Sequence, residues 1–182
     1  MATPQEIRIK RLKKDWEEMR SISCPVIGWT AAGDPPTRYV VSYRIESIVD
    51  PQGDDGKPAY RGEHKVLIEI PSGYPLSGES PVARMDESYK PVFHPNFWPG
   101  GLICIWGGGT TNWNPTDTIA LLCIRIARML QFDEVLTQES HRANAQAADW
   151  YAAKKHSGLF PTDTQVLPIP SLFDDEGDFV FL

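Results

Sequence analysis

Long hydrophobic runs and an excess of positive charge are both missing from this 182-residue chain. No stretch approaches the roughly 18 consecutive apolar residues that a membrane-spanning helix requires. The N-terminal sequence MATPQEIRIK also lacks the apolar centre of a secretory signal. From these absences we expect a cytoplasmic protein with no membrane association.

Cysteine is scarce as well. The three cysteines, Cys24, Cys104 and Cys123, are an odd number, and no two of them have the CxxC spacing. This argues against a disulfide framework and against a structural zinc site. We therefore expect reduced thiols and no metal, with Cys123 a core residue because it falls on an apolar stripe.

The net charge of −6 disfavours general binding to nucleic acid. The charges are unevenly spread, with a basic segment at 8–14 and an acidic one at 174–178. The simplest interpretation is a solvated helix face and an acidic tail. The basic segment consists of Arg8, Lys10, Arg11, Lys13 and Lys14.

The length suits one domain with tails. Apolar residues recur every three or four positions over 4–20, which predicts an amphipathic helix. One side of this helix should pack while the basic side stays in solvent. The apolar positions are Ile9, Leu12, Trp16 and Met19.

The middle of the chain is rich in β-branched and aromatic residues. The segments 38–49, 63–70 and 81–85 suit strands, and 71–101, dense in Pro and Gly, suits ordered loop and turn. The stretch 25–36 ahead of the first strand is also rich in Pro and Gly. No helical pattern separates these strands. We therefore predict an antiparallel, four-stranded meander.

Two helices should follow this sheet. Asn114 is a good N-cap with Pro115 at the first helical position, and a further helix is expected over 142–156, packed through Trp150 and Tyr151. The fold class is therefore α+β, with an N-terminal helix, the sheet and C-terminal helices. We expect one domain at 1–156 and a Pro-rich acidic tail at 157–182.

Cys104 has a different setting from Cys123. It lies between an irregular Gly-containing segment and the run 107–109, where minimal backbone bulk would let a large partner approach. No basic residue lies within nine positions on either side, so nothing local lowers the thiol pKa far below ~8.5. The alternative is a buried cysteine at the end of a strand.

Asn96 directly follows a proline, whose backbone is rigid. Pro95 restricts its own backbone and pushes His94 toward an extended conformation, so the Asn96 amide can be aimed. A fixed amide donor near a thiol can stabilise the oxyanion of acyl transfer by about 3 to 4 kcal/mol. The alternatives are a loop asparagine for Asn96, and either a base or a structural residue for His94.

Three segments together resemble the ubiquitin-conjugating enzymes. The catalytic segment of that family is similar to HPNFWPGGLIC, at 94–104, followed by WNPTDTI, at 113–119. The strand and the P-x-x-Y-P element of the family resemble 67–82, and RLKKDW resembles its first-helix signature. The resemblance covers about residues 5 to 155 and implies the fold of that family.

The resemblance implies a thioester relay. Cys104 would accept a ubiquitin-like protein from an activating enzyme and pass it to a lysine of a target protein, with no cofactor of its own. Asn96 would stabilise the oxyanion or hold the active-site loop. The first helix, through Arg8, Arg11 and Lys14, would dock the activating enzyme. A ligase would touch the loops that carry Leu76, Pro115 and Thr116.

The chain also departs from the family pattern. Trp106 stands where many members have aspartate, and 131–144 replaces the PNPxDPL-type segment. In many relatives this region holds an acidic or polar gate over the cysteine, a residue that orients and deprotonates the incoming lysine. In this chain the gate would come from 131–144, with His141 either a base or a surface residue. The Gly-rich loop and the tail resemble stand-alone bacterial members found in phage-defence operons. The gate candidates are Asp133, Glu139, Ser140 and His141.

Two other functions remain open at this point. A ubiquitin-conjugating-like binding module without activity would generally lack the cysteine. A cysteine hydrolase would pair Cys104 with His94 or His141 and would need an orienting acid, for which no motif is evident.

Overall fold

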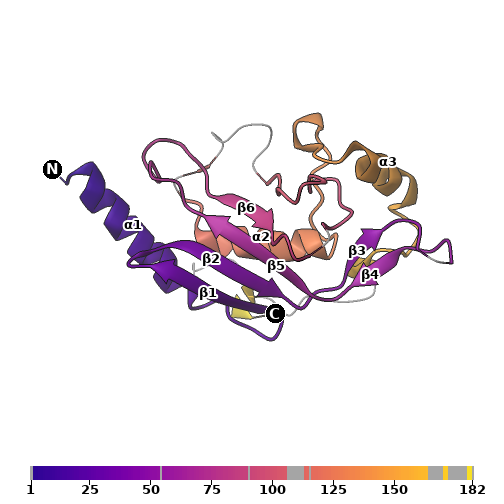
Figure 1. Cartoon of the computed structure of the whole chain (residues 1–182), viewed down its shortest axis with the longest axis horizontal. Helices are drawn as coiled ribbons and strands as arrows, with labels where there is room; N and C mark the ends of the chain where they lie inside the picture. The colour runs from indigo at the N-terminus through magenta and orange to yellow at the C-terminus, as the bar shows by residue number, and fades with distance from the viewer. Residues whose placement is uncertain are drawn as a thin grey trace.

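A four-stranded antiparallel sheet forms the centre of the fold, with α1 at one end and α2 across one face (Figure 1). Its strands are β1 (Ile27–Gly33), β2 (Pro36–Tyr43), β5 (His64–Glu69) and β6 (Val82–Met85), in that spatial order. The computed structural model describes residues 2–53, 55–89, 91–105, 113–114 and 116–163, and the backbone at 170–171 and 180–181, where β7 (Pro170–Ser171) pairs with β8 (Val180–Phe181).

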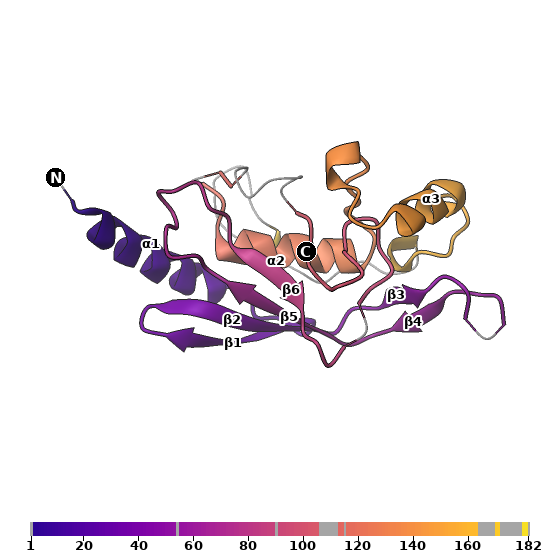
Figure 2. The ribbon, with the colours of Figure 1, turned by 45° about the horizontal axis from the view of Figure 1, so that its top comes forward.

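The predicted α+β class and four-stranded antiparallel sheet are confirmed, but two strand boundaries were wrong. The Pro- and Gly-rich stretch 25–36, where no strand was predicted, contains β1, because pairing with β2 outweighs its Gly and Pro content. The segment 38–49 is not one strand. Its end forms β3 (Ser47–Asp50), which pairs with β4 (Ala59–Arg61) in a separate hairpin (Figure 2).

Helix α1 (Pro4–Met19) agrees with its prediction and begins with a capping box. The Thr3 side chain accepts a hydrogen bond from the Glu6 amide, and the Glu6 carboxylate accepts one from the Thr3 amide. The inward row is Leu12, Asp15 and Met19. Ile9 and Trp16, which were expected to pack, are instead 37% and 39% exposed, since Asp15 takes the inward position between Leu12 and Met19.

Helix α2 (Ile119–Leu130) starts later than predicted. Its N-cap is Thr118, whose hydroxyl accepts from the Leu121 amide at 3.2 Å. Asn114 instead makes a turn ahead of the helix, where its side chain accepts from the Thr116 amide at 3.1 Å. Nine residues of α2 are buried, including Cys123, as expected. In the part of the chain that the structure describes, no helix has the length and apolarity to cross a bilayer.

Helix α3 (Ala145–Lys154) lies inside the predicted range and carries a second apolar cluster. The start of the expected tail joins this cluster, because Phe160 is 3% exposed and the short 3-10 helix Pro161–Asp163 follows it. Most of the remaining tail lies outside the described residues. The cluster comprises Ile48, Phe132 and Phe160, with Phe93, Val135, Trp150 and Tyr151 packed against it.

Acid should weaken this fold through His64, which is buried between three polar groups. Its Nε2 donates to the carbonyls of Arg61 and Ile45, and its Nδ1 accepts from the Arg61 guanidinium at 3.1 Å. Burial first, and the Arg61 charge second, lower the pKa of His64 to about 4. The unfolded chain, with a histidine pKa near ~6.5, then binds the proton first as pH falls. This contribution is complete above about pH 6.5 and is lost as pH falls toward 4.

The free energy of unfolding should therefore fall by about 2 kcal/mol between pH 7 and pH 5 from this residue. Urea unfolding at both pH values measures the loss. A His64→Gln variant should lose less stability over that interval, while His156→Gln, at an exposed position, should behave as the wild type. An unchanged pH dependence in His64→Gln would contradict the assignment.

Candidate active site

Asn96 and Cys104 face each other in a hairpin that follows β6. The Cys104 amide donates to the Asn96 carbonyl at 2.8 Å, and the Trp98 amide donates to the Leu102 carbonyl at 2.8 Å. The hairpin turns at Gly101, whose φ of +87° favours glycine. A side chain there would also meet Met85 Cβ at 3.3 Å. The glycine therefore allows the hairpin to lie against β6 and to bring Cys104 opposite Asn96.

The Cys104 side chain is half-buried, whereas its neighbours Ile103 and Ile105 are 7% and 2% exposed. None of the three cysteines forms a disulfide. The alternating burial turns the flanking isoleucines into the core and leaves Cys104 at the surface. Cys123 differs, since burial raises the pKa of its thiol to about 12. Trp106 and the glycines at 107–109 lie outside the described residues.

The Asn96 side chain is buried and holds a loop of the chain 40 residues away. Its Nδ2 donates to the carbonyls of Leu136 and His141 at 2.8 and 2.9 Å, and its Oδ1 accepts from the Leu136 amide at 2.9 Å. Both amide hydrogens are thus already bound to carbonyls. Of the two roles considered for Asn96, this geometry is that of a loop clamp.

His94 lies beneath this clamp as a packed core residue. Its Nδ1 accepts a hydrogen bond from the backbone amide of Asn96 at 3.1 Å. Its ring centroid lies 4.5 Å from that of Phe132 and 5.2 Å from that of Phe97. Burial lowers the pKa of His94 to about 3. This environment agrees with the structural alternative and offers no route by which His94 could act as a base.

The gate candidates differ in their link to Asn96. His141 is joined to it through its carbonyl, and burial, followed by the Arg125 charge, lowers the pKa of its ring. Asp133 pairs with Arg128 at 2.7 Å at the end of α2. The Glu139 side chain is 88% exposed, and Ser140 is also exposed. The structure therefore ties His141, but not Asp133, to the segment that carries Cys104.

A second anchor of this loop, an ion pair, could not be predicted from the sequence. The Arg125 guanidinium donates twice to the same Glu134 carboxylate oxygen, at 2.9 and 2.6 Å. Arg125 belongs to α2 and Glu134 to the loop, so the pair attaches the start of the loop to the core. The side chains are 20% and 16% exposed, so water screens the pair only partly. No local pattern marks this pair, because its members are nine positions apart and not in one helix.

The expected partner-binding residues of α1 are largely engaged within the chain. Arg8 donates to the carbonyls of Pro71 and Tyr74, both at 2.7 Å. The Arg11 side chain is 14% exposed, pairs with Asp15 at 3.1 Å and also donates to the Asp117 carbonyl. These two arginines therefore attach α1 to the neighbouring loops.

Asp15, at the centre of this contact, also accepts from the Tyr74 hydroxyl at 2.6 Å. Burial raises the pKa of Asp15, while the hydrogen bonds from Tyr74 and Arg11 favour its ionised form.

Few of the expected partner-binding residues are exposed. Lys14 is 66% exposed, Leu76 is 55% exposed and Thr116 is exposed, whereas Pro115 lies outside the described residues.

Solved structures of ubiquitin-conjugating enzymes are similar to this chain in fold. The ubiquitin conjugating enzyme UbcA1 from Agrocybe aegerita is 23% identical, with a TM-score of 0.50 over 68% of this chain and 82% of that one. A structure described as a novel ubiquitin-conjugating enzyme is 19% identical, with a TM-score of 0.56 over 84% and 89%. No family model and no curated protein matches the chain. The chain therefore has the fold of the ubiquitin-conjugating enzymes.

Proposed function

We propose that this protein is a conjugating enzyme that carries a ubiquitin-like protein on Cys104 and transfers it to a lysine. The proposal depends chiefly on one observation, the hairpin that sets a half-buried Cys104 opposite the buried Asn96 in this fold. The HPN segment and the cysteine at the expected spacing add support from the sequence.

Two acyl transfers make up the proposed reaction. The Cys104 thiolate attacks the carbonyl of the thioester that joins the modifier to the activating enzyme, forming a new C–S bond and releasing the cysteine of that enzyme. A lysine amine of the target then attacks the new thioester. An amide bond forms, the Cys104 thiolate leaves, and the amine loses its proton to a base.

The residues around Cys104 would act in different ways. Asn96 holds the loop 136–141 against the hairpin, so the acceptor lysine would meet a defined surface. His141 is a candidate to receive the lysine proton, since burial and Arg125 favour its neutral form. Lys14 on α1 would contribute to docking of the activating enzyme, and Leu76 and Thr116 to docking of a ligase.

Loading on Cys104 tests this proposal. The purified protein is incubated with an activating enzyme, ATP and a ubiquitin-like protein, and the products are separated with and without a thiol reagent. We expect an adduct that the thiol reagent removes and that peptide mapping places on Cys104. Absence of any adduct would favour a binding module without activity.

Turnover of an ester or amide substrate would instead favour a cysteine hydrolase. The burial of His94 weighs against its use as the base of a hydrolase, because its ring is fully buried and packed on Phe132, whereas the half-buried Cys104 lies at the surface. An anti-phage role in bacteria, suggested by the resemblance of the Gly-rich loop and the tail, is part of the proposal. It predicts genes for an activating enzyme and a ubiquitin-like protein beside this one.

A further inference from the structure

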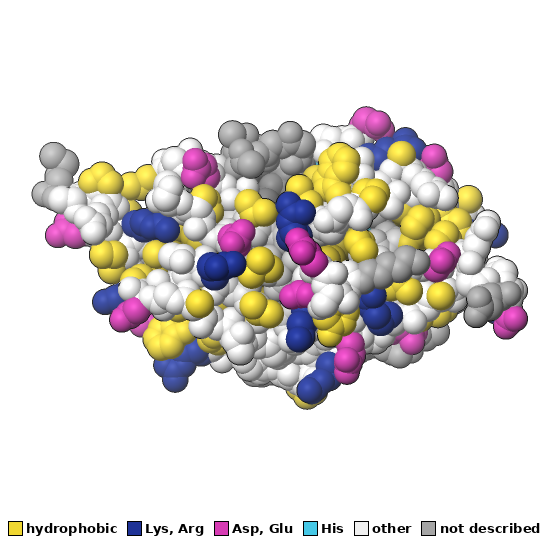
Figure 3. Space-filling view, viewed as in Figure 1, with side chains coloured by type: hydrophobic (Ala, Val, Ile, Leu, Met, Phe, Trp, Pro, Cys, Tyr) yellow, Lys and Arg dark blue, Asp and Glu magenta, His cyan; other side chains and the backbone are white. Residues whose placement is uncertain are grey.

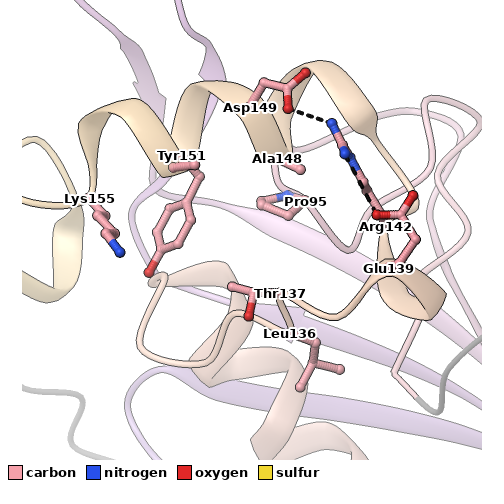
Figure 4. Close-up of a pocket in the computed structure, with 10 residues that line it drawn as sticks. Pro95, Leu136, Thr137, Glu139, Arg142, Ala148, Asp149, Tyr151 and Lys155 are labelled. Atoms are coloured by element: carbon pink, nitrogen blue, oxygen red, sulfur yellow. Dashed lines mark hydrogen bonds and ion pairs between the residues drawn. The ribbon is translucent and has the colours of Figure 1, made fainter.

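A cavity of about 320 Å³ lies between the loop clamped by Asn96 and helix α3 (Figure 4). Its floor is Pro95, the residue directly before Asn96, and Leu136 of the clamped loop forms one wall. Small side chains on α3, Ala148 and Ala152, keep the opposite wall open. The cavity therefore lies next to the segment that holds Cys104 in place.

The two ends of the cavity differ in charge. At one end Arg142 lies between Glu139 and Asp149, at 3.7 and 2.5 Å, so its charge is already balanced. At the other end the side chains of Lys155 and Tyr151 point the same way (Figure 4). Lys155 makes no ion pair with any residue that the structure describes. Burial, followed by the Asp163 charge, raises the pKa of Tyr151, so its hydroxyl keeps the proton that it can donate.

Hydrogen-bond donors accompany this cation. The Tyr151 hydroxyl and the Thr137 hydroxyl both belong to lining residues, and each can donate to an anion. The Tyr151 ring is fixed by stacking on Phe132 and by an edge contact with Phe160, at centroid distances of 6.2 and 5.2 Å. A rigid hydroxyl beside a flexible ammonium is suited to a carboxylate. The apolar floor and walls would accept the rest of a side chain.

We propose that this cavity binds an acidic side chain of the target protein, close in sequence to the lysine that is modified. The inference rests on the proposed function: the cavity adjoins Pro95 and the clamped loop, next to the hairpin that carries Cys104, so a peptide whose lysine reaches Cys104 can extend toward it. An extended peptide advances about 3.3 Å per residue, so an acidic residue a few positions from the lysine could reach the cavity. Lys155 would then select targets by their charge.

Peptide acceptors test this proposal. The enzyme is first loaded with the modifier, and the thioester is then chased with peptides that carry one lysine and a single glutamate moved from five positions before it to five after it. Each peptide has a glutamine counterpart. At one or two positions we expect the glutamate peptide to discharge the thioester about fivefold faster than its counterpart, with the advantage declining as salt rises.

Matched variants identify the cavity as the cause. Lys155→Glu should abolish the preference and favour a peptide with lysine at the same position, while Lys154→Glu, an equal charge change on the exposed neighbour, should retain it. Ala152→Phe should block the cavity, and Ala153→Phe, outside the lining, should not. No difference between glutamate and glutamine peptides at any position, or an equal loss in both lysine variants, would overturn the proposal.

Binding to the unloaded protein separates this inference from the proposed function. In an NMR titration, the favoured glutamate peptide should shift the amide signals of Thr137 and Tyr151 in the wild type but not in Lys155→Glu. If no thioester forms but these shifts appear, only the proposed function fails. If the thioester forms and neither the shifts nor the preference appear, only the acidic-target site fails. Equal shifts with inorganic phosphate would indicate a small-anion site and contradict the peptide assignment.

Discussion

A Cys104→Ser variant is expected to change the chemistry of the adduct and to stop its onward transfer. A serine at this position keeps the hairpin, since the Cys104 contact with Asn96 is made by the backbone. The adduct would become an oxyester, which resists thiols and reacts poorly with amines because an alkoxide is a much worse leaving group than a thiolate. Transfer to lysine should fall at least about a hundredfold, which corresponds to about 2.7 kcal/mol in the barrier.

Gel separation with a thiol reagent, and again with alkali, measures this result. The adduct of Cys104→Ser should survive the thiol and be cleaved by alkali. Cys24→Ser is the matched control, because Cys24 is also half-buried and not in a disulfide, and it should load and discharge as the wild type does. A thiol-sensitive adduct that persists in Cys104→Ser would place the acceptor elsewhere.

Asn96→Ala should cost both stability and the second transfer step. The substitution removes three hydrogen bonds and leaves the Leu136 amide and carbonyl without partners, while the His141 carbonyl keeps its bond from the Ala143 amide. We expect the free energy of unfolding to drop by about 2 to 4 kcal/mol, since each unsatisfied group costs about 1 kcal/mol or more. Discharge to lysine should slow more than loading, because the loop that faces the acceptor is released.

A second variant separates a loop clamp from an oxyanion donor. Glu134→Gln weakens the other anchor of the same loop, the pair with Arg125, without touching Asn96. If Asn96 acts by holding the loop, Glu134→Gln should also slow discharge while loading is preserved, although less than Asn96→Ala. Discharge at the wild-type rate in Asn96→Ala would remove any role of Asn96 in this step. An effect of Asn96→Ala alone would instead favour direct contact with the oxyanion.

The outer face of the sheet carries charges of both signs. Basic and acidic side chains alternate with apolar ones over the outer face of the sheet, without a single dominant sign of charge (Figure 3). Salt should therefore influence local contacts, such as those of Lys155, more than the approach of a large partner to this face. Rates measured at two salt concentrations distinguish the two effects.

Local sequence determined the elements whose contacts are close in the chain. The capping box of Thr3 and Glu6 starts α1 where predicted, because both hydrogen bonds span only three residues. The β-branched and aromatic residues of 38–49 and 63–70 predicted the central strands, because such side chains suit a pleated surface that is half-buried, as β5 is. The Pro and Gly content of 71–101 likewise predicted ordered loop and turn ahead of Cys104.

Tertiary structure decided what lies opposite those residues. The partners of the Asn96 side chain are backbone groups 40 and 45 positions away. Every residue has such groups, so the amino-acid sequence does not indicate which of them Asn96 will bind. Arg11, expected on a solvated face, is inward because Asp15 and the Asp117 carbonyl lie there. β1 was missed because pairing across the sheet, and not its own composition, makes it a strand. Hydrogen bonds between distant segments depend on how the core packs, and packing is a property of the whole chain.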